Sequence, residues 1–542
     1  MNRLYYGDCL TVMQNMKSAS VDLIYLDPPF NSDRTYNNIY KDETGRPLPD
    51  QIDAFCDMWE LDEETERIVR TMPVLMRDAG VDDSAAELWK LWLNALRKTR
   101  PKLLAYLSYM TQRLLQMKVI LKATGSIYLH CDPTAAHYIK IMMDSIFWHE
   151  NFRSEIVWKR TSAHSGARRP GPVHDTILFY TKSDKYAWTG TYQDYDDLYV
   201  ETFYPHKDPD GRRWSRADLT GAGVVQDGET GQPWRGINVS LKGRHWARKP
   251  ADLDKLDAEG RIHWPAREGG MPRLKLYLDE QPGIPLQDVW TDIRPIHNLA
   301  AERMGYRTQK PVELLKRIIE SSSKPDDVVF DPFCGCATTI EAAHLLKRQW
   351  VGIDIAIHAI KRVARIRLED RLGLKEGTDF ELDGVPRNLE GAQDLWDRDK
   401  YHFQKWAVEQ IDGFVTSKRT ADGGIDGRLY FGVPWRPELQ SMVIEVKGGK
   451  NVSVESLRAL RGVLDNDEAL MAGLIIMEPL GSAKDRNFHR FMAEAGDLEV
   501  QGVEYPKMQI LTVGEILDGK RFNTPGVARL RARQPTLPGS LG

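Results

Sequence analysis

The segment 327–355, "DVVFDPFCGCATTIEAAHLLKRQWVGIDI", constrains the fold of this chain most strongly. Its pattern predicts a buried strand, a tight loop of small residues, a helix and a second buried strand. That order is typical of a doubly wound α/β sheet, in which helices connect and cover parallel strands. The loop lets backbone approach a ligand, and the free amides of the helix N-terminus would face it. Asp331 and Asp354 end the two strands, where Asp354 is placed to accept hydrogen bonds from ribose hydroxyls.

The run "VDLIYLDPPF" (21–30) is a second expected strand, and it ends in a carboxylate, two prolines and an aromatic ring. An ordinary strand end explains such a sequence, because proline donates no hydrogen bond to a sheet and stops a strand. A functional loop is the alternative. The four residues alone favour the ordinary strand end, so the choice depends on the other motifs of the chain.

Composition limits the class of protein. A chain of 542 residues is expected to form two or three domains. Five cysteines without a CxxC pair predict neither a disulfide framework nor a zinc site, which favours a reducing compartment and a cytoplasmic protein. The sequence has no run of eighteen apolar residues, which a membrane span would need, and no GxxxxGK[ST] motif, which an ATP-driven motor would need.

Two stretches, near 158–174 and 211–249, mix arginine and lysine with tryptophan. This mixture suits phosphate contacts combined with stacking on bases or sugars. A solvated surface with ordinary tryptophans explains it equally well. The net charge of −4 does not by itself indicate a partner.

The early "DPPF", "QKP" at 309–311 and the late "DPFCGCATT" occur together in an order that resembles the beta class of DNA amino-methyltransferases. The resemblance covers about residues 1–370. It implies a Rossmann-like α/β domain with a mostly parallel seven-stranded sheet, S-adenosylmethionine as cofactor and double-stranded DNA as partner. It also implies a helical insertion at about 45–123 and a target-recognition region at about 160–290.

The resemblance assigns roles to individual residues. The carboxylate of Asp27 and the carbonyl of Pro28 would accept the hydrogens of an exocyclic amine, Pro29 would keep the loop rigid, and Phe30 would stack on a flipped base. Aspartate in the first position favours adenine N6 over cytosine N4. The residues implied for the cofactor are Asp8, Cys9, Lys310, Asp331, Phe333, Gly335, Thr338 and Asp354. Ala337 departs from the glycine common in the family, and we expect its small methyl group to be tolerated. His130 and His164 either contact the base or are structural, and the structural role is favoured.

A second group of polar residues lies near the C-terminus. Glu445 and Lys447 share one face of an expected strand, and Asp426 begins the preceding strand, which would place it beside them. Two carboxylates can hold Mg²⁺, and a lysine can orient the water that attacks a phosphodiester. An isolated E-x-K pair is usually a solvated ion pair. Glu409, on an upstream helix, is a further expected metal ligand.

The stretch 400–480 resembles the Mrr-type restriction endonucleases of the PD-(D/E)XK superfamily, although Ile425 stands where the leading proline is expected. The implied organisation is a linker at 371–399, an α/β nuclease domain at 400–518, and a basic tail at 519–542. The whole chain then reads as an adenine methyltransferase fused to an endonuclease that acts in restriction-modification or phage defence. Cleavage of both strands would need a homodimer or second copy, and a separate ATPase or helicase subunit could supply translocation.

Two alternatives remain open from the sequence. In one, the C-terminal unit is a catalytically silent DNA-binding or partner-docking module and the chain only methylates. In the other, RNA rather than DNA is methylated. The recognition sequence cannot be derived from these patterns, because direct readout depends on the placement of side chains.

Overall fold

The computed structural model describes residues 2–29, 35–38, 52–56, 59, 61–161, 168, 170–267, 270–297, 300, 302–304, 309–357, 359–416, 425–449, 452–466 and 469–526. The chain divides into two compact units. Unit 1 comprises Met1–Thr189 and Asp288–Gly542, and unit 2 comprises Gly190–Gln287. Phe30 and His164 lie outside the described residues.

The largest element of unit 1 is a nine-stranded sheet in which only one strand, β7, runs antiparallel to its neighbours. The mostly parallel α/β architecture agrees with the prediction, but the number of strands is nine and not seven. In spatial order the strands are β16 (Val289–Trp290), β6 (Phe152–Lys159), β7 (His174–Thr181), β5 (Leu121–Cys131), β2 (Val21–Leu26), β17 (Val328–Asp331), β18 (Gln349–Asp354), β1 (Asn2–Tyr6) and β19 (Phe380–Asp383).

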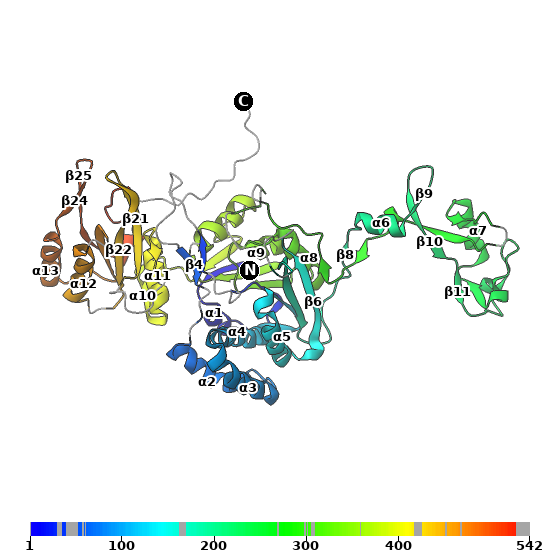
Figure 1. Ribbon diagram of the computed structural model, residues 1–542, viewed down its shortest axis with the longest axis horizontal. Coiled ribbons are helices and arrows are strands. Elements are labelled where there is room, and N and C mark those ends of the chain that lie inside the picture. Colours follow the sequence, from blue (N-terminus) through cyan, green and yellow to red (C-terminus); the bar gives the residue numbers. More distant parts are fainter. Residues whose placement is uncertain are drawn as a thin grey trace, which may run out of the picture. The chain divides into compact units, whose positions relative to one another are not determined.

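Helices cover both faces of this sheet. Figure 1 shows α1 (Cys9–Gln14), α4 (Pro101–Ile120) and α5 (Pro133–Phe147) on one face, and α8 (Val312–Ser322) and α9 (Thr338–Leu345) on the other. The inner strands β2, β5, β7 and β17 are buried from both sides over most of their length, so they contain continuous apolar runs and not alternating ones. In β2, for example, five of the six residues are buried. This is the doubly wound arrangement that the sequence predicts.

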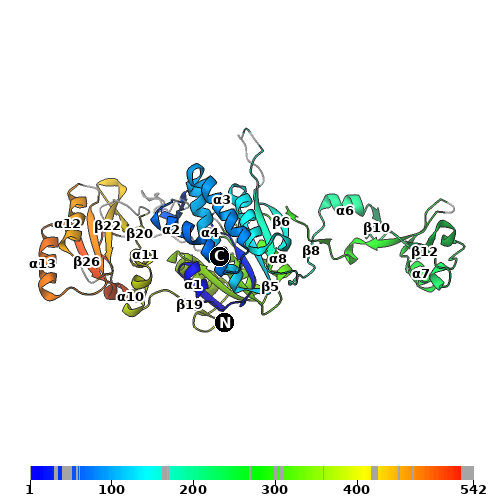
Figure 2. The ribbon, with the colours of Figure 1, turned by 90° about the horizontal axis from the view of Figure 1, so that it is seen from below.

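The predicted helical insertion consists of α2 (Glu63–Asp78), α3 (Asp83–Thr99) and α4, which pack against one another (Figure 2). Asp62 and Asp82 cap α2 and α3, because their carboxylates accept hydrogen bonds from free backbone amides of the first turn. The fully buried Trp89 joins the helices through a 3.0 Å hydrogen bond from its indole nitrogen to the carbonyl of Val69. Two short strands, β3 (Thr35–Asn38) and β4 (Ile52–Cys56), pair with each other.

The segment 371–399 is not an irregular linker, as predicted, but contains two regular elements. Strand β19 pairs in parallel with β1 at the edge of the large sheet, and α10 (Leu389–Arg398) follows it. The strand was missed because only four residues form it, and buried residues alternate with half-buried acidic ones. The first α/β domain therefore extends beyond the predicted boundary at residue 370.

The C-terminal part of unit 1 contains a second, five-stranded mixed sheet. Its spatial order is β20 (Phe414–Val415), β21 (Gly427–Val433), β22 (Arg436–Lys447), β23 (Met471–Ile476) and β26 (Met508–Thr512). The first three strands are antiparallel and the last three are parallel. The accompanying elements are α11 (Lys400–Gln410), α12 (Val454–Asp465), α13 (Ser482–Ala493), α14 (Val513–Leu517) and the hairpin β24 (Asp497–Val500) with β25 (Val503–Pro506).

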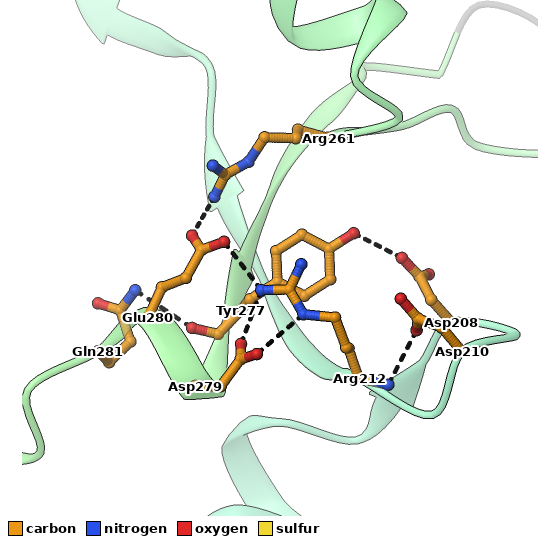
Figure 3. A network of polar contacts seen from close by, with 8 residues as sticks. All are labelled: Asp208, Asp210, Arg212, Arg261, Tyr277, Asp279, Glu280 and Gln281. Carbon is orange, nitrogen blue, oxygen red and sulfur yellow. Dashed lines mark hydrogen bonds and ion pairs between the residues drawn. The ribbon is translucent and has the colours of Figure 1, made fainter.

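Unit 2 is built from short strands and two helices around a small core that contains Trp234, Trp246 and Leu253. A network of ion pairs and hydrogen bonds supports its main sheet, as Figure 3 shows: Arg212 binds Asp279 and Glu280, and Tyr277 donates to Asp208. Its strands are β8 (Tyr192–Gln193) with β15 (Ile284–Pro285), β11 (Thr220–Ala222) with β12 (Arg244–Trp246), and the sheet of β13 (Ile262–His263), β14 (Arg273–Tyr277), β10 (Arg213–Asp218) and β9 (His206–Lys207); its helices are α6 (Asp197–Phe203) and α7 (Pro250–Ala258).

Candidate active sites

The two Asp-Pro motifs meet at one edge of the large sheet. Strands β2 and β17 are direct parallel neighbours, with Leu23 opposite Val329 and Ile24 opposite Phe330. Asp331 is the last residue of β17, and Asp27 directly follows β2. The carboxyl ends of parallel strands are where ligands bind in open α/β sheets. About 300 residues of sequence separate the motifs, and the fold brings them together.

Asp27 is mostly buried and is held from one side. Its Oδ2 accepts a hydrogen bond from the ammonium group of Lys310. Its Oδ1 is buried and has no hydrogen-bond partner among the described residues. Pro28 is buried and Pro29 is half-buried, so the backbone after Asp27 is fixed as well as the carboxylate. Lys310 thus anchors the carboxylate through Oδ2, while the buried Oδ1 is placed to accept a hydrogen bond.

The loop after β17 is held by two carboxylates, Asp331 at the end of β17 and Asp354 at the end of β18. Asp331 Oδ1 accepts from the amide of Phe333 at 3.0 Å, and Asp354 accepts from the amides of Gly335 and Ala356, both at 2.8 Å. Burial raises the pKa of Asp331 to about 7 and that of Asp354 to about 6, and the amide hydrogen bonds oppose the shift. Both carboxylates are therefore poised to ionise when a cationic or hydrogen-bonding ligand arrives.

Ala337 lies in the left-handed region, with φ of 60°, directly before α9, which begins at Thr338. Glycine adopts this conformation without strain, whereas an L-residue does so only where the surrounding structure enforces it. The alanine is fully buried, so its methyl group is accommodated in the loop at the cost of some backbone strain.

A buried arginine that sequence reasoning missed lies beside Asp8 and Cys9. Arg113 of α4 pairs with the Asp8 carboxylate, donates to Cys9 Sγ at 3.3 Å and stacks 3.3 Å from the ring centroid of Tyr109. The negative and aromatic surroundings hold the pKa of Arg113 above its ordinary value despite burial. Tyr109 in turn faces Phe333 of the loop after β17, with ring centroids 6.5 Å apart. In the sequence Arg113 is one more charged residue of a helix, and nothing local relates it to Asp8.

The C-terminal sheet brings three of the four predicted residues together. Gly427 of β21 lies opposite Ile444 of β22, so Asp426 lies beside the segment of Glu445, and its Oδ2 accepts from the amide of Val446 at 2.7 Å. Lys447 Nζ lies 2.7 Å from Glu445 Oε1. The other oxygen of Glu445 is buried and has no hydrogen-bond partner in the described part of the chain.

Electrostatics support the proximity of these groups. Burial raises the pKa of Asp426 to about 6; the charge of Glu445 adds to the rise, while the Val446 amide and Lys447 oppose it. Two carboxylates and an ammonium group therefore share one mostly buried position.

Glu409 does not join Asp426 and Glu445 in a metal-binding group. It lies in the last turn of α11. Over the residues that the structure describes, no cluster of three or more histidine, cysteine or acidic side chains is arranged to hold a metal ion. The predicted three-carboxylate site is thus replaced by a pair, which still fits Mg²⁺, because this ion is commonly held by one or two carboxylates together with substrate phosphates and water.

None of the described helices is both long enough and apolar enough to cross a bilayer.

Known proteins resemble the first domain. A family profile described as DNA methylase, of the N6/N4 type, matches residues 21–365. The type II methyltransferase M.EcaI of Enterobacter cloacae is 36% identical over 262 residues, which cover 48% of this chain and 57% of the relative. The StyLTI Mod subunit, part of a type III restriction-modification enzyme of Salmonella typhimurium, is 27% identical over 63% of this chain and 49% of the relative.

The DNA adenine methyltransferase YhdJ of Escherichia coli is 22% identical over 66% of this chain and 80% of the relative. The chain thus spans only about half the length of the first two relatives.

Proposed function

The chain belongs to the N6/N4 DNA methylase family, and from this premise we propose that it transfers a methyl group from S-adenosylmethionine to N6 of adenine in duplex DNA. The observation that carries the proposal is the position of Asp27 beside Asp331 at the carboxyl edge of neighbouring parallel strands. One motif would hold the amine and the other the cofactor. Their adjacency is what methyl transfer between two bound molecules needs.

The residues of the Asp27 loop suit the chemistry of an exocyclic amine. Such an amine is a poor nucleophile, because its lone pair is delocalised into the ring. Asp27 Oδ1 and the carbonyl of Pro28 would accept its two hydrogens and so favour a nitrogen that directs its lone pair at the methyl group. Phe30, outside the described residues, would stack on the base after it leaves the duplex.

The cofactor residues would act around the loop of β17. Bound S-adenosylmethionine supplies an electrophilic methyl group on a sulfonium ion. Asp354 would bind the ribose hydroxyls, and Asp8, Cys9 and Phe333 would surround the adenine ring. The rest of the cofactor would be held by Asp331, Gly335, Thr338 and Lys310. Arg113 would fix Asp8 in place through their ion pair.

The choice of adenine over cytosine rests on Asp27 in the first motif position and on similarity to an adenine-specific relative. The test is transfer of labelled methyl groups from S-adenosylmethionine onto duplex DNA, single-stranded RNA and no substrate, with the product nucleoside identified by mass spectrometry. We expect N6-methyladenine in DNA. N4-methylcytosine would correct the target base, and label in RNA alone would refute the proposal.

Cofactor affinity is expected to depend on pH. Burial raises the pKa of Asp331 to about 7, so the unliganded protein is stabilised by the neutral acid below about pH 4 and loses this contribution as the pH rises through 7. A cationic cofactor favours the ionised form, so its affinity should increase between pH 5.5 and 7.5, by at most about tenfold per unit. Calorimetric titration at these two pH values checks the slope.

The control for this prediction is Asp331→Asn, which should bind more weakly and with a smaller slope. The slope that remains below pH 6 would then come from Asp354, whose pKa is about 6. Affinity that stays constant or decreases with rising pH in the wild-type protein would contradict the assignment of Asp331 to the cofactor.

Unit 2 is proposed to recognise the target sequence. It falls within the predicted region 160–290, and exposed basic side chains such as Arg216 and Arg248 lie on it beside a tryptophan-containing core. Arginine and lysine suit contacts to phosphates and to base edges.

For the C-terminal domain we propose a Mg²⁺-dependent endonuclease that uses Asp426, Glu445 and Lys447. The two carboxylates would hold Mg²⁺, which would polarise the phosphodiester, and Lys447 would orient the attacking water. The assembled trio and the unpartnered buried oxygen of Glu445 support this proposal. The competing proposal is a silent binding module.

The two activities together would make a restriction-modification enzyme. Because one nuclease site cuts one strand, a homodimer or a second bound copy is part of this proposal. Similarity to a Mod subunit leaves room for a separate partner that supplies translocation.

A further inference from the structure

A continuous chain of polar side chains, buried except at its Arg160 end, lies next to Asp27 in the sheet. The hydroxyl of Tyr25 is 2.9 Å from His130 Nδ1, and His130 Nε2 is 3.1 Å from Asp175 Oδ2. Arg160 Nε completes the chain with an ion pair at 3.2 Å to the other oxygen of Asp175. The ring of Trp158 covers His130 edge-on, with centroids 5.8 Å apart.

This arrangement is costly to bury. The His130 side chain is completely inaccessible and that of Asp175 is 3% exposed. A buried carboxylate must be compensated by charge and hydrogen bonds to remain ionised. A structural histidine needs no ionised partner, so the presence of Asp175 calls for a reason at this place in the fold.

The sheet places the chain next to the reacting position. In β2 and β5, Leu26 lies opposite Leu129, so the following residues, Asp27 and His130, are neighbours across the strands. In β5 and β7, Cys131 lies opposite Thr176, next to Asp175. Three adjacent strands therefore supply Tyr25, His130 and Asp175 at the same carboxyl edge as Asp27.

Asp175 also interacts with Lys310, the partner of Asp27. Burial tends to raise the pKa of Asp175, but the hydrogen bond from His130 and the charges of His130, Lys310 and Arg160 outweigh it and lower the pKa. Lys310, whose ammonium group binds Asp27, thus also lies in the field of Asp175.

We propose that Asp175, held by His130 and Tyr25, is a positioning residue for methyl transfer, because it shares the Lys310 ammonium with Asp27 and so keeps Asp27 Oδ1 a strong hydrogen-bond acceptor. The inference rests on the proposed function. Without the Asp175 charge, Lys310 would lose one of the negative charges that act on it and would withdraw more negative charge from Asp27. The amine would then meet a weaker acceptor, although both ligands would still bind.

The test is Asp175→Asn, which keeps the size of the side chain and an oxygen that can accept from His130. We expect kcat for methyl transfer to fall about tenfold or more, the effect of losing one nearby charge. KM for DNA and the cofactor dissociation constant should change less than about twofold, because Asp175 would touch neither ligand. A twofold change in affinity corresponds to a free energy of RT ln 2, which is small beside that of a tenfold change in kcat.

A matched control is Asp22→Asn on β2, the strand that carries Tyr25 and is followed directly by Asp27. Asp22 also forms a half-buried pair, with Lys122 Nζ at 2.7 Å, and accepts from the Val328 amide at 2.9 Å, but it lies at the amino end of the strand. Its replacement should lower the melting temperature and leave kcat unchanged. A kcat loss equal to that of Asp175→Asn would mean that any disturbance of β2 impairs the site, and would overturn the inference.

Tyr25→Phe decides the matter if Asp175→Asn does not fold. Removing the hydroxyl breaks its hydrogen bond with His130 Nδ1 and should lower kcat about fivefold, the value of one hydrogen bond. An unchanged kcat in either folded variant, or a loss confined to KM, overturns the inference. If the wild-type protein transfers no methyl group, the proposed function itself fails; if it does and the variants equal it, only the role of Asp175 fails.

Discussion

Asp27→Ala is expected to reduce methyl transfer to DNA about a thousandfold, the upper end of the loss seen when one preorganised electrostatic contact to a reacting group is removed. Asp27 is the only charged residue in the described part of this loop, residues 27–29, and its Oδ1 has no competing partner among the described residues. Removing it leaves the exocyclic amine with the carbonyl of Pro28 alone. Single-turnover transfer from labelled S-adenosylmethionine measures the effect.

The controls separate chemistry from folding. Asp27→Ala also removes the partner of Lys310, so the melting temperature and cofactor affinity must be measured beside the rate. Asp27→Asn retains an oxygen acceptor without the charge and should keep more activity than alanine does. Methyl transfer by Asp27→Ala at more than about a tenth of the wild-type rate would show that this loop is not the catalytic one, since effects at such sites are a hundredfold or larger.

Local sequence pattern was sufficient to predict the doubly wound sheet. Buried strands are recognisable in the sequence as apolar runs, and the tight turn after Asp331 is recognisable by its small residues. The resemblance places both motifs in one α/β domain, whereas the direct pairing of β2 with β17 comes from the structure. The register between them, with Leu23 opposite Val329, could come only from the structure.

Other features escaped prediction because they depend on long-range contacts. The Arg113–Asp8 pair joins residues 105 positions apart, and on α4 the arginine has no local signature. His130 was interpreted as structural because a lone histidine in an apolar strand usually is. Its partner Asp175 is two strands away along the chain and shows its meaning only when β5 and β7 pair.

Edge elements were missed for a different reason. Strand β19 has four residues and β16 has two, which is too short for a periodic pattern to emerge above irregular sequence. Both add to the sheet through backbone hydrogen bonds, which any residue but proline can make.

Strand geometry alone was enough to predict that Asp426, Glu445 and Lys447 lie close together. Alternation put Glu445 and Lys447 on one face, and a hairpin put Asp426 beside them; the register of β21 and β22 has this form. Glu409 was assigned from a helix whose orientation relative to the sheet no local pattern gives, and it does not complete a metal-binding cluster. Strand neighbours are thus predictable where helix–sheet packing is not.

Asp426→Ala is expected to abolish Mg²⁺-dependent cleavage of plasmid DNA, with a loss of about a hundredfold or more, because it removes one of two carboxylates from the metal. Glu445→Gln should do the same, since Glu445 would provide the other ligand and is the ion-pair partner of Lys447. Glu438→Gln is the matched control: this glutamate is exposed on the same strand, β22, and its replacement should leave cleavage unchanged. Methyl transfer should persist in all three variants.

Unmethylated plasmid and plasmid methylated by the same protein are compared with and without S-adenosylmethionine. Cleavage of only the unmethylated plasmid indicates ordinary restriction, and cleavage of only the methylated plasmid indicates a modification-dependent nuclease. If wild type and Asp426→Ala leave both plasmids equally intact, the carboxylate pair is not a nuclease site in this chain, and the domain is the silent binding module that competes with the proposal.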